Sequence, residues 1–352
     1  MKKKLLSALL CTAMAASLLV GCGGSTDGTG TSDGGSSSGK KTYAIVPKSA
    51  GNPYNEKEVE GFKEIIEANG GEVVVSYPES ATADAQISCI NSLISQGVDS
   101  IAVAANDENA LQAVLQDAMD AGIKVSCLDS SVNKDSRMTF ANQAGVTEVA
   151  TALCDAVYDI AGGEGQWAIV SASSQATNQN AWIDAMKEIM ESDSKYSKLE
   201  LVDIQYGDDE PELSTTVTQA LLTNYKDLKV ICAPTTVGIA AAAKVLQDQN
   251  STCKLTGLGL PSEMAEYIGD DDAHSCPYMF LWNPLDLGKL SAYISMALVD
   301  GTITGKEGDT FKAAELNTDY EVVSASDGGT EVILGAPFKF DPSNIDEWKS
   351  VY

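Results

Sequence analysis

The side chains best suited to chemistry in this sequence are amides and hydroxyls. In the stretch SASSQATNQNAWIDAM, Asn178 and Gln179 follow an apolar run and precede a helix-like pattern. An amide both donates and accepts hydrogen bonds, but it does not act as a general acid or base. This segment therefore indicates a site that binds an uncharged molecule rich in hydroxyl groups, rather than a catalytic loop.

The other reactive residue types give little support for an enzyme. His274 is the only histidine, and it follows three aspartates in a loop-like segment. The sequence contains no G-x-S-x-G, P-loop or H-E-x-x-H motif, and the glycine-rich stretches GLGLP and AGGEG do not open a helix after the first strand. We therefore predict a binding protein with no catalytic residues and no cofactor.

The charge of the chain limits its partners. The formal net charge is −27, and Arg137 is the only arginine. Such an acidic surface repels nucleic acids and polyanionic ligands. The acidic runs YGDDEPE and IGDDDAH lack the spacing of a calcium loop, so we interpret both as solvated loops and predict no metal site.

The amino terminus has the design of an export signal. Residues 1–21 combine a Lys-rich start with an apolar stretch, and LVGC resembles the lipobox of bacterial lipoproteins. This resemblance implies cleavage before Cys22 and lipid attachment to it; the alternatives are an uncleaved membrane helix or an ordinary signal peptide. Residues 22–41 are rich in Gly and Ser and predict a flexible linker. We expect an extracytoplasmic domain held at the membrane by a lipid anchor.

The remaining cysteines are interpreted as small core residues. Most lie in apolar, periodic segments, and no C-x-x-C motif occurs. A disulfide between Cys253 and Cys276 is left open.

Short apolar strands alternate with amphipathic helices from Thr42 onward. In the helix-like segment 55–70, for example, Val59, Phe62, Ile65 and Ile66 fall at helical spacing. This alternation predicts an α/β fold with parallel sheets covered on both faces, and its length predicts two doubly wound, Rossmann-like lobes. Ligands of such sheets bind beyond the carboxyl ends of the strands.

The predicted strand ends carry hydrogen-bonding groups and aromatic rings in both lobes. A polyol needs this mixture of donors, acceptors and flat apolar surface. Each residue also has a structural interpretation: Lys48 as an exposed lysine, Asp129 as a turn cap, Asn178 as a helix cap and Trp182 as core. The candidates are Lys48, Asp129, Asn142, Asn178, Gln179, Pro234 and Thr236, with Tyr54, Phe140, Trp182 and Trp282 nearby.

Several long motifs resemble the periplasmic binding protein type I family. They include VPKSAGNPY, ATNQNAWI, APTTVGIAAAA, TGLGLPSEM and LWNPLDLGKLSAY, in the same order as in the family. The resemblance implies two lobes joined by three hinge segments, near residues 142–143, 283–284 and 302–306. By this pattern the N-terminal lobe comprises residues 42–142 and 284–303, and the C-terminal lobe comprises residues 143–283 and 304–352.

The most similar members are the solute-binding proteins of rhamnose-type ABC importers and the receptors for the quorum signal autoinducer-2. By resemblance to these receptors, Lys48, Asp129, Gln179 and Pro234 bind the ligand. Two positions depart from the receptors, which have aspartate where this chain has Asn178 and alanine where it has Thr236.

The resemblance implies a rhamnose-type sugar as ligand, with autoinducer-2 as the alternative. The implied partners are an ABC permease and ATPase, and we expect a monomer. A lesser alternative is a sensor subunit that presents its ligand to a membrane kinase or chemoreceptor.

Overall fold

A computed structural model describes residues 39–352 of the chain. The predicted signal segment, the lipidation residue Cys22 and most of the predicted linker lie outside the described residues. Within residues 39–352, no helix has the length and apolar character that a membrane crossing requires.

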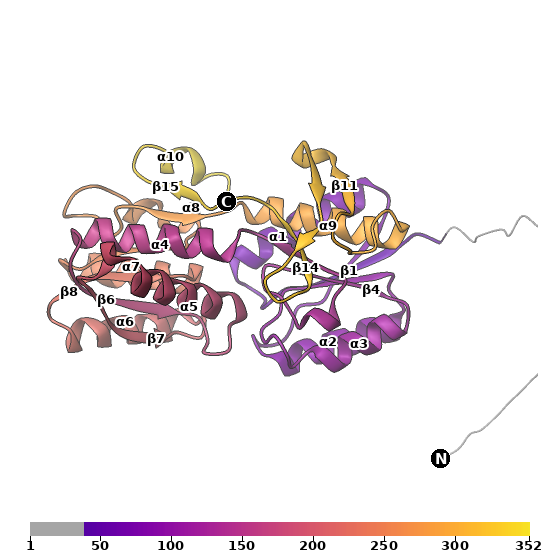
Figure 1. The fold of residues 1–352 in the computed structure, drawn as a ribbon, viewed down its shortest axis with the longest axis horizontal. Helices are drawn as coiled ribbons and strands as arrows, with labels where there is room; N and C mark the ends of the chain where they lie inside the picture. The colour runs from indigo at the N-terminus through magenta and orange to yellow at the C-terminus, as the bar shows by residue number, and fades with distance from the viewer. Residues whose placement is uncertain (1–38) are drawn as a thin grey trace, which may run out of the picture. The chain divides into compact units, whose positions relative to one another are not determined.

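The first lobe contains a seven-stranded sheet with the strand order β13-β14-β5-β4-β3-β1-β2 (Figure 1). The first five strands in the sequence are parallel to their neighbours. Helices α1 (Pro53–Ala68) and α9 (Pro284–Asp300) cover one face, and α2 (Ala83–Gln96) and α3 (Gln112–Asp120) cover the other. These strands are β1 (Thr42–Val46), β2 (Glu72–Val75), β3 (Ser100–Val103), β4 (Lys124–Leu128) and β5 (Thr139–Asn142).

The second lobe contains a four-stranded parallel sheet with the strand order β7-β6-β8-β9. Its strands are β6 (Gly165–Ser171), β7 (Leu199–Tyr206), β8 (Leu228–Ala233) and β9 (Lys254–Gly257). Helices α4 (Val146–Ala161) and α5 (Thr177–Ser192) pack together, as do α6 (Pro211–Asn224) and α7 (Thr236–Asp248). The short elements α8 (Pro261–Met264), β10 (Met279–Leu281), β15 (Phe338–Phe340) and α10 (Ile345–Trp348) complete the lobe.

The helical spacing seen in the sequence corresponds to a buried stripe on α1. Val59, Phe62, Ile65 and Ile66 are all buried against the first sheet and α9. The helix begins at Pro53, and the side chain of Asn52 caps it by accepting a hydrogen bond from the amide of Tyr54. The apolar periodicity and the terminal cap thus agree on the position of the helix that follows β1.

Glycine allows α1 and α9 to approach each other closely. A Cβ atom on Gly288 would lie 2.0 Å from the main-chain oxygen of Glu58, and one on Gly61 would lie 2.0 Å from that of Leu285. The two helix backbones therefore touch at these positions, which holds α1 rigidly against α9.

Three segments of the chain pass between the two sheets. The chain leaves the first sheet at Asn142, the end of β5, and enters α4 of the second lobe. It returns at Asn283, which precedes α9. The third segment differs from the expectation of residues 302–306.

Residues 304–333 lie in the first lobe rather than the second. The hairpin of β11 (Thr310–Ala313) and β12 (Thr318–Glu321) lies beside α9, and β13 (Val323–Ser324) and β14 (Thr330–Ile333) extend the first sheet. Glu331 of β14 pairs with Phe140 of β5, so the third crossing lies between β14 and β15. The reason is that β14 covers the edge of β5, which would otherwise carry unpaired backbone groups.

The cysteine pairing left open by the sequence is also settled by the fold. Cys253 and Cys276 are both free and buried, each within the core of the second lobe. Burial raises the pKa of the Cys253 thiol to about 12. These residues therefore act as small apolar core residues.

Candidate ligand-binding site

The carboxyl ends of the two sheets meet at a small cavity between the lobes. Its volume is about 40 Å³, and its walls come from the segments after β1, β4, β6, β7 and β8. In each sheet the strand order changes direction between two neighbouring strands, β1 and β3 in the first lobe and β6 and β8 in the second. Ligands of such sheets bind beyond the carboxyl ends of these strands. The predicted site residues that line the cavity are Lys48, Asp129, Asn178, Gln179, Trp182, Pro234, Thr236 and Trp282.

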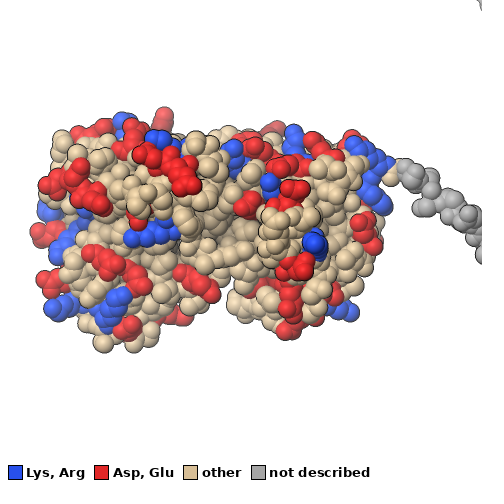
Figure 2. Space-filling model, turned by 90° about the horizontal axis from the view of Figure 1, so that it is seen from above, with Lys and Arg blue, Asp and Glu red and all other residues tan. Residues whose placement is uncertain are grey.

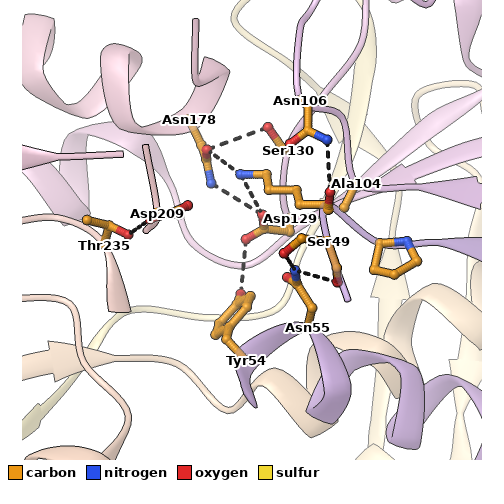
Figure 3. Close-up of polar contacts among 12 residues, drawn as sticks. Ser49, Tyr54, Asn55, Ala104, Asn106, Asp129, Ser130, Asn178, Asp209 and Thr235 are labelled. Atoms are coloured by element: carbon orange, nitrogen blue, oxygen red, sulfur yellow. Dashed lines mark hydrogen bonds and ion pairs between the residues drawn. The ribbon is translucent and has the colours of Figure 1, made fainter. Parts of the chain in front are cut away.

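A hydrogen-bonded cluster of three residues joins the lobes across this cavity (Figure 3). The ammonium of Lys48 donates to Oδ1 of Asn178 at 2.9 Å and lies 3.1 Å from Oδ2 of Asp129. Asn178 in turn donates from Nδ2 to the same carboxylate oxygen at 3.4 Å. The side chains of Lys48 and Asp129 are only 13% and 5% exposed, so the ion pair is largely removed from water.

Several structural interpretations from the sequence are excluded by these contacts. Lys48 is not an exposed lysine, and Asn178 is not the cap of α5, since Ala176 occupies the N-cap position. Asp129 directs its carboxylate toward other side chains across the site rather than toward its own turn. Trp182 is buried and lines the cavity, so it both packs in the core and forms part of the wall.

The backbone around Lys48 and Asp129 holds both side chains in place. Asn106 donates from Nδ2 to the main-chain oxygen of Lys48 at 2.9 Å, and Gln86 donates to that of Pro47 at 3.2 Å. Asp129 has a φ of 57°, in the left-handed region that few residues other than glycine adopt. This conformation turns the chain at the end of β4 so that the carboxylate faces the second lobe.

Tyr54 connects Asp129 to the aromatic wall of the cavity. Its hydroxyl donates to Oδ1 of Asp129 at 3.0 Å and accepts a hydrogen bond from Nε1 of Trp282 at 2.6 Å. The rings of Trp282 and Trp182 have centroids 5.7 Å apart. Burial raises the pKa of Tyr54 well above its usual value, with a further contribution from Asp129, so the hydroxyl remains a donor. The sequence placed Tyr54 near the site only as an aromatic ring.

Other predicted residues lie outside the small cavity. Phe140 and Asn142 line a wider groove of about 440 Å³, which shares Asp129, Asn178 and Trp182 with it. Asn142 donates from Nδ2 to Oε2 of Glu331 at 2.8 Å, which ties the first crossing to β14. These two residues therefore line the groove that adjoins the small cavity, and their role in ligand binding stays a prediction.

Four polar residues that line the cavity are absent from the predicted set: Asn52, Asn55, Asp209 and Thr235. Asp209 belongs to the acidic run that we interpreted as a solvated loop, yet it lines the cavity, and Thr235 donates a hydrogen bond from Oγ1 to its Oδ1. The available signal was position, because the run directly follows β7 and so lies at the carboxyl end of a strand. By composition alone the run resembles solvent-exposed surface. Asp and Glu residues are also exposed on both lobes (Figure 2).

A second buried carboxyl group lies behind the site. Glu58 of α1 is fully buried, and neither of its carboxyl oxygens has a hydrogen-bond partner among residues 39–352. Burial raises the pKa of Glu58 well above its usual value, Asp129 raises it further, and Lys48 opposes the shift. Burial without a hydrogen-bond partner therefore favours the protonated form of Glu58 over the charged carboxylate.

Residues 43–303 match the periplasmic binding protein domain family, and this match spans both lobes. The chain belongs to the periplasmic binding protein family. The resemblance seen in the sequence and the expected two-lobed α/β fold are thereby confirmed, and the family is one of extracytoplasmic binding proteins.

Solved structures of periplasmic binding proteins agree with this assignment. An ABC transporter solute-binding protein from Clostridium phytofermentas with bound L-rhamnose is 61% identical, with a TM-score of 0.87, covering 89% of this chain and 99% of that one. A sugar ABC transporter protein from Actinomyces odontolyticus is 38% identical, with a TM-score of 0.69 and coverages of 88% and 97%. LsrB from Clostridium saccharobutylicum in complex with AI-2 is 22% identical, with a TM-score of 0.81 and coverages of 87% and 99%, and it supports the fold.

Proposed function

We propose that this periplasmic binding protein is the solute-binding subunit of an ABC importer for a rhamnose-type sugar. The observation that carries the proposal is the relative with bound L-rhamnose, which is 61% identical over 89% of this chain. At this identity the residues that surround the cavity are expected to serve the same class of ligand. Cys22 as a lipid anchor, a permease and ATPase as partners, and a monomeric state belong to the same proposal.

The chemistry of the cavity supports a neutral, hydroxyl-rich ligand. Asp129 is a charged acceptor, Lys48 is a charged donor, and Asn178 supplies both an acceptor and donors. The indole rings of Trp182 and Trp282 offer the flat apolar surface that packs against the C–H face of a sugar. The carboxylate of Asp129 would repel an anionic sugar, while the ammonium of Lys48 would attract it. The site therefore binds an anionic sugar less favourably than a neutral one.

Ligand entry requires the cavity to enlarge. Its volume of about 40 Å³ has room for about one water, because one water takes up about 30 Å³ of liquid volume. The direct contacts between Lys48 and Asn178 bridge the lobes where a ligand would lie. We therefore propose that the lobes separate by bending at the three crossing segments and close again around the sugar.

Autoinducer-2 is a second candidate ligand. LsrB in complex with AI-2 has the same fold with a TM-score of 0.81, and Lys48, Asp129, Gln179 and Pro234 of this chain resemble the residues of such receptors. Asn178 and Thr236 are the departures. A neutral hydrogen bond contributes only about 1 kcal/mol, so two changed positions do not exclude a small polyol of this kind.

The proposal is tested by calorimetry and thermal denaturation of the purified protein with L-rhamnose, ribose, galactose and autoinducer-2. We expect L-rhamnose to release heat and to raise the melting temperature, with weaker or no response to ribose and galactose. A response to autoinducer-2 alone would favour the second candidate. No response to any of the four ligands at millimolar concentration would contradict the proposed function.

The choice between import and sensing is tested in cells. Deletion of the gene is expected to abolish uptake of labelled L-rhamnose if the protein serves an importer. If uptake is unchanged while a transcriptional response to the sugar is lost, the sensor alternative is correct.

A further inference from the structure

Among residues 39–352, Asp209 is the one carboxylate that the second lobe contributes to the cavity. It follows β7 and shares the cavity with Asp129, which the first lobe contributes from the end of β4. The side chain is half-buried, and its Oδ1 accepts a hydrogen bond from Thr235, the residue that precedes α7 (Figure 3). Both carboxylates are therefore fixed at strand ends that face each other across the space for a ligand.

The backbone at Asp209 is held in an unfavourable conformation. Asp208 and Asp209 have φ values of 50° and 53°, and Asp129 has a φ of 57°. Residues other than glycine are uncommon in this region, and those that adopt it concentrate at ligand clamps. The loop is nevertheless fixed, because the amides of Gly207 and Asp208 donate to the main-chain oxygens of Ser171 and Ala172 at the end of β6.

One oxygen of Asp209 is available to a ligand. Thr235 bonds to Oδ1, and no donor among residues 39–352 bonds to Oδ2. Burial raises the pKa of Asp209, whereas Thr235 and Lys48 lower it, so Lys48 acts on this carboxylate as well as on Asp129. A half-buried carboxylate with an open lone pair loses hydration without a full set of donors, and a hydroxyl of the ligand would supply the missing hydrogen bond.

We propose that Asp209 is a ligand-binding residue that accepts a hydroxyl hydrogen bond from the sugar and, together with Asp129, selects ligands with donor hydroxyls on two sides of the ring. This assignment rests on the proposed function and adds to it a specificity determinant. A pyranose with separated free hydroxyls donates to one carboxylate in each lobe, so lobe closure and ligand recognition depend on the same two contacts. A ligand with hydroxyls on one side only leaves one carboxylate unpaired.

The test compares Asp209→Asn with Asp208→Asn as a matched control. Both variants remove one charge from the same turn, and asparagine tolerates the left-handed conformation. Asp208 is exposed and does not line the small cavity, so its variant measures the general effect of charge. By calorimetry we expect Asp209→Asn to weaken L-rhamnose binding by about tenfold or more, as for a lost hydrogen bond to a charged group, and Asp208→Asn to change it less than about twofold.

Deoxy analogues locate the contact on the sugar. One of the monodeoxy derivatives of L-rhamnose is expected to bind the wild type about tenfold more weakly than the parent sugar but to bind Asp209→Asn no more weakly than L-rhamnose does. Thr235→Val, which removes the hydrogen bond to Oδ1, is expected to show an intermediate affinity. Circular dichroism of each variant verifies that it is folded.

The outcomes separate the two proposals. If the wild type binds L-rhamnose, and both Asp209→Asn and Thr235→Val bind it equally well, the assignment of Asp209 is wrong and the proposed function stands. If the affinity of every monodeoxy analogue, relative to that of L-rhamnose, falls by the same factor in the wild type and in Asp209→Asn, Asp209 does not touch the ligand. A wild type that binds none of the sugars overturns the proposed function and the assignment with it.

Discussion

Lys48 of the first lobe donates a 2.9 Å hydrogen bond to the side-chain oxygen of Asn178 in the second lobe. The same ammonium lies 3.1 Å from the carboxylate of Asp129, to which Asn178 also donates. One amide thus meets an ammonium with its oxygen and a carboxylate with its nitrogen, which a carboxylate at position 178 cannot do. The identity of this residue therefore sets the electrostatics of the surface between the lobes.

Asn178→Asp is expected to shift ligand preference. The new carboxylate would still accept from Lys48, but it would lose the hydrogen bond to Asp129 and add a like charge beside it. We expect L-rhamnose affinity to fall by about tenfold and autoinducer-2 affinity to rise, both measured by calorimetry. The control is Asn180→Asp, because Asn180 donates to the main-chain oxygen of Ser174 and does not line the small cavity. Unchanged affinities for both ligands would show that position 178 does not set specificity.

Tyr54→Phe is expected to destabilise the protein and weaken ligand binding. The variant leaves Nε1 of Trp282 without its acceptor and Oδ1 of Asp129 without a donor, and an unpaired buried polar group costs about 1–3 kcal/mol. The free energy of unfolding from urea denaturation should fall by this amount. Tyr77→Phe removes an exposed hydroxyl bonded to Glu56 and should have little effect. Equal stability of Tyr54→Phe and wild type would mean that water replaces the hydroxyl.

Glu58→Gln is expected to change the pH dependence of stability. The raised pKa in the folded state means that the folded protein binds more protons at Glu58 than the unfolded chain, in which this pKa is about 4.3. The contribution of Glu58 to stability therefore decreases as pH rises from this value toward the folded pKa, by up to about 1.4 kcal/mol per pH unit. Above the folded pKa its contribution no longer changes with pH.

Glutamine at position 58 removes this titration. The variant should match or exceed the stability of the wild type near pH 7, and its unfolding free energy should change less between pH 5 and pH 8. The control is Glu67→Gln, an exposed residue of the same helix, which should retain the wild-type profile. Parallel pH profiles for Glu58→Gln and wild type would show that Glu58 is ionised in the folded protein.

Gly288→Ala is expected to separate α1 from α9. The added methyl group would lie 2.0 Å from the main-chain oxygen of Glu58, so the helices must shift, at a cost of about 1–3 kcal/mol for overpacking. Gly335→Ala is the control, because a Cβ atom there meets no heavy atom of the described part of the chain within 4 Å. Both variants are compared by urea denaturation. A Gly288→Ala variant as stable as wild type would show that the two helices can move apart at little cost in the free energy of unfolding.

The sequence alone was sufficient to predict the features that depend on residues close together in the chain. The period of the apolar residues predicted α1, and the alternation of strands and helices predicted two doubly wound lobes with their ligand groups at the strand ends. Lys48, Asp129 and Asn178 could therefore be selected before any contact between them was known. Their types and positions after strands do not depend on distant parts of the chain.

Only the tertiary structure decided the features that depend on distant partners. The lobe to which β14 belongs is set by its pairing with β5, almost 200 residues earlier in the sequence, which no local pattern encodes. Asp209 resembles any other acid in a surface loop until β7 and β8 bring it beside Thr235. Glu58 looks like one more charged residue of an amphipathic helix, and its burial follows from the close approach of α9. Sequence thus determined which groups stand at the strand ends, and the packing of the two lobes decided which of them meet, because burial and charge pairing depend on neighbours from the whole chain.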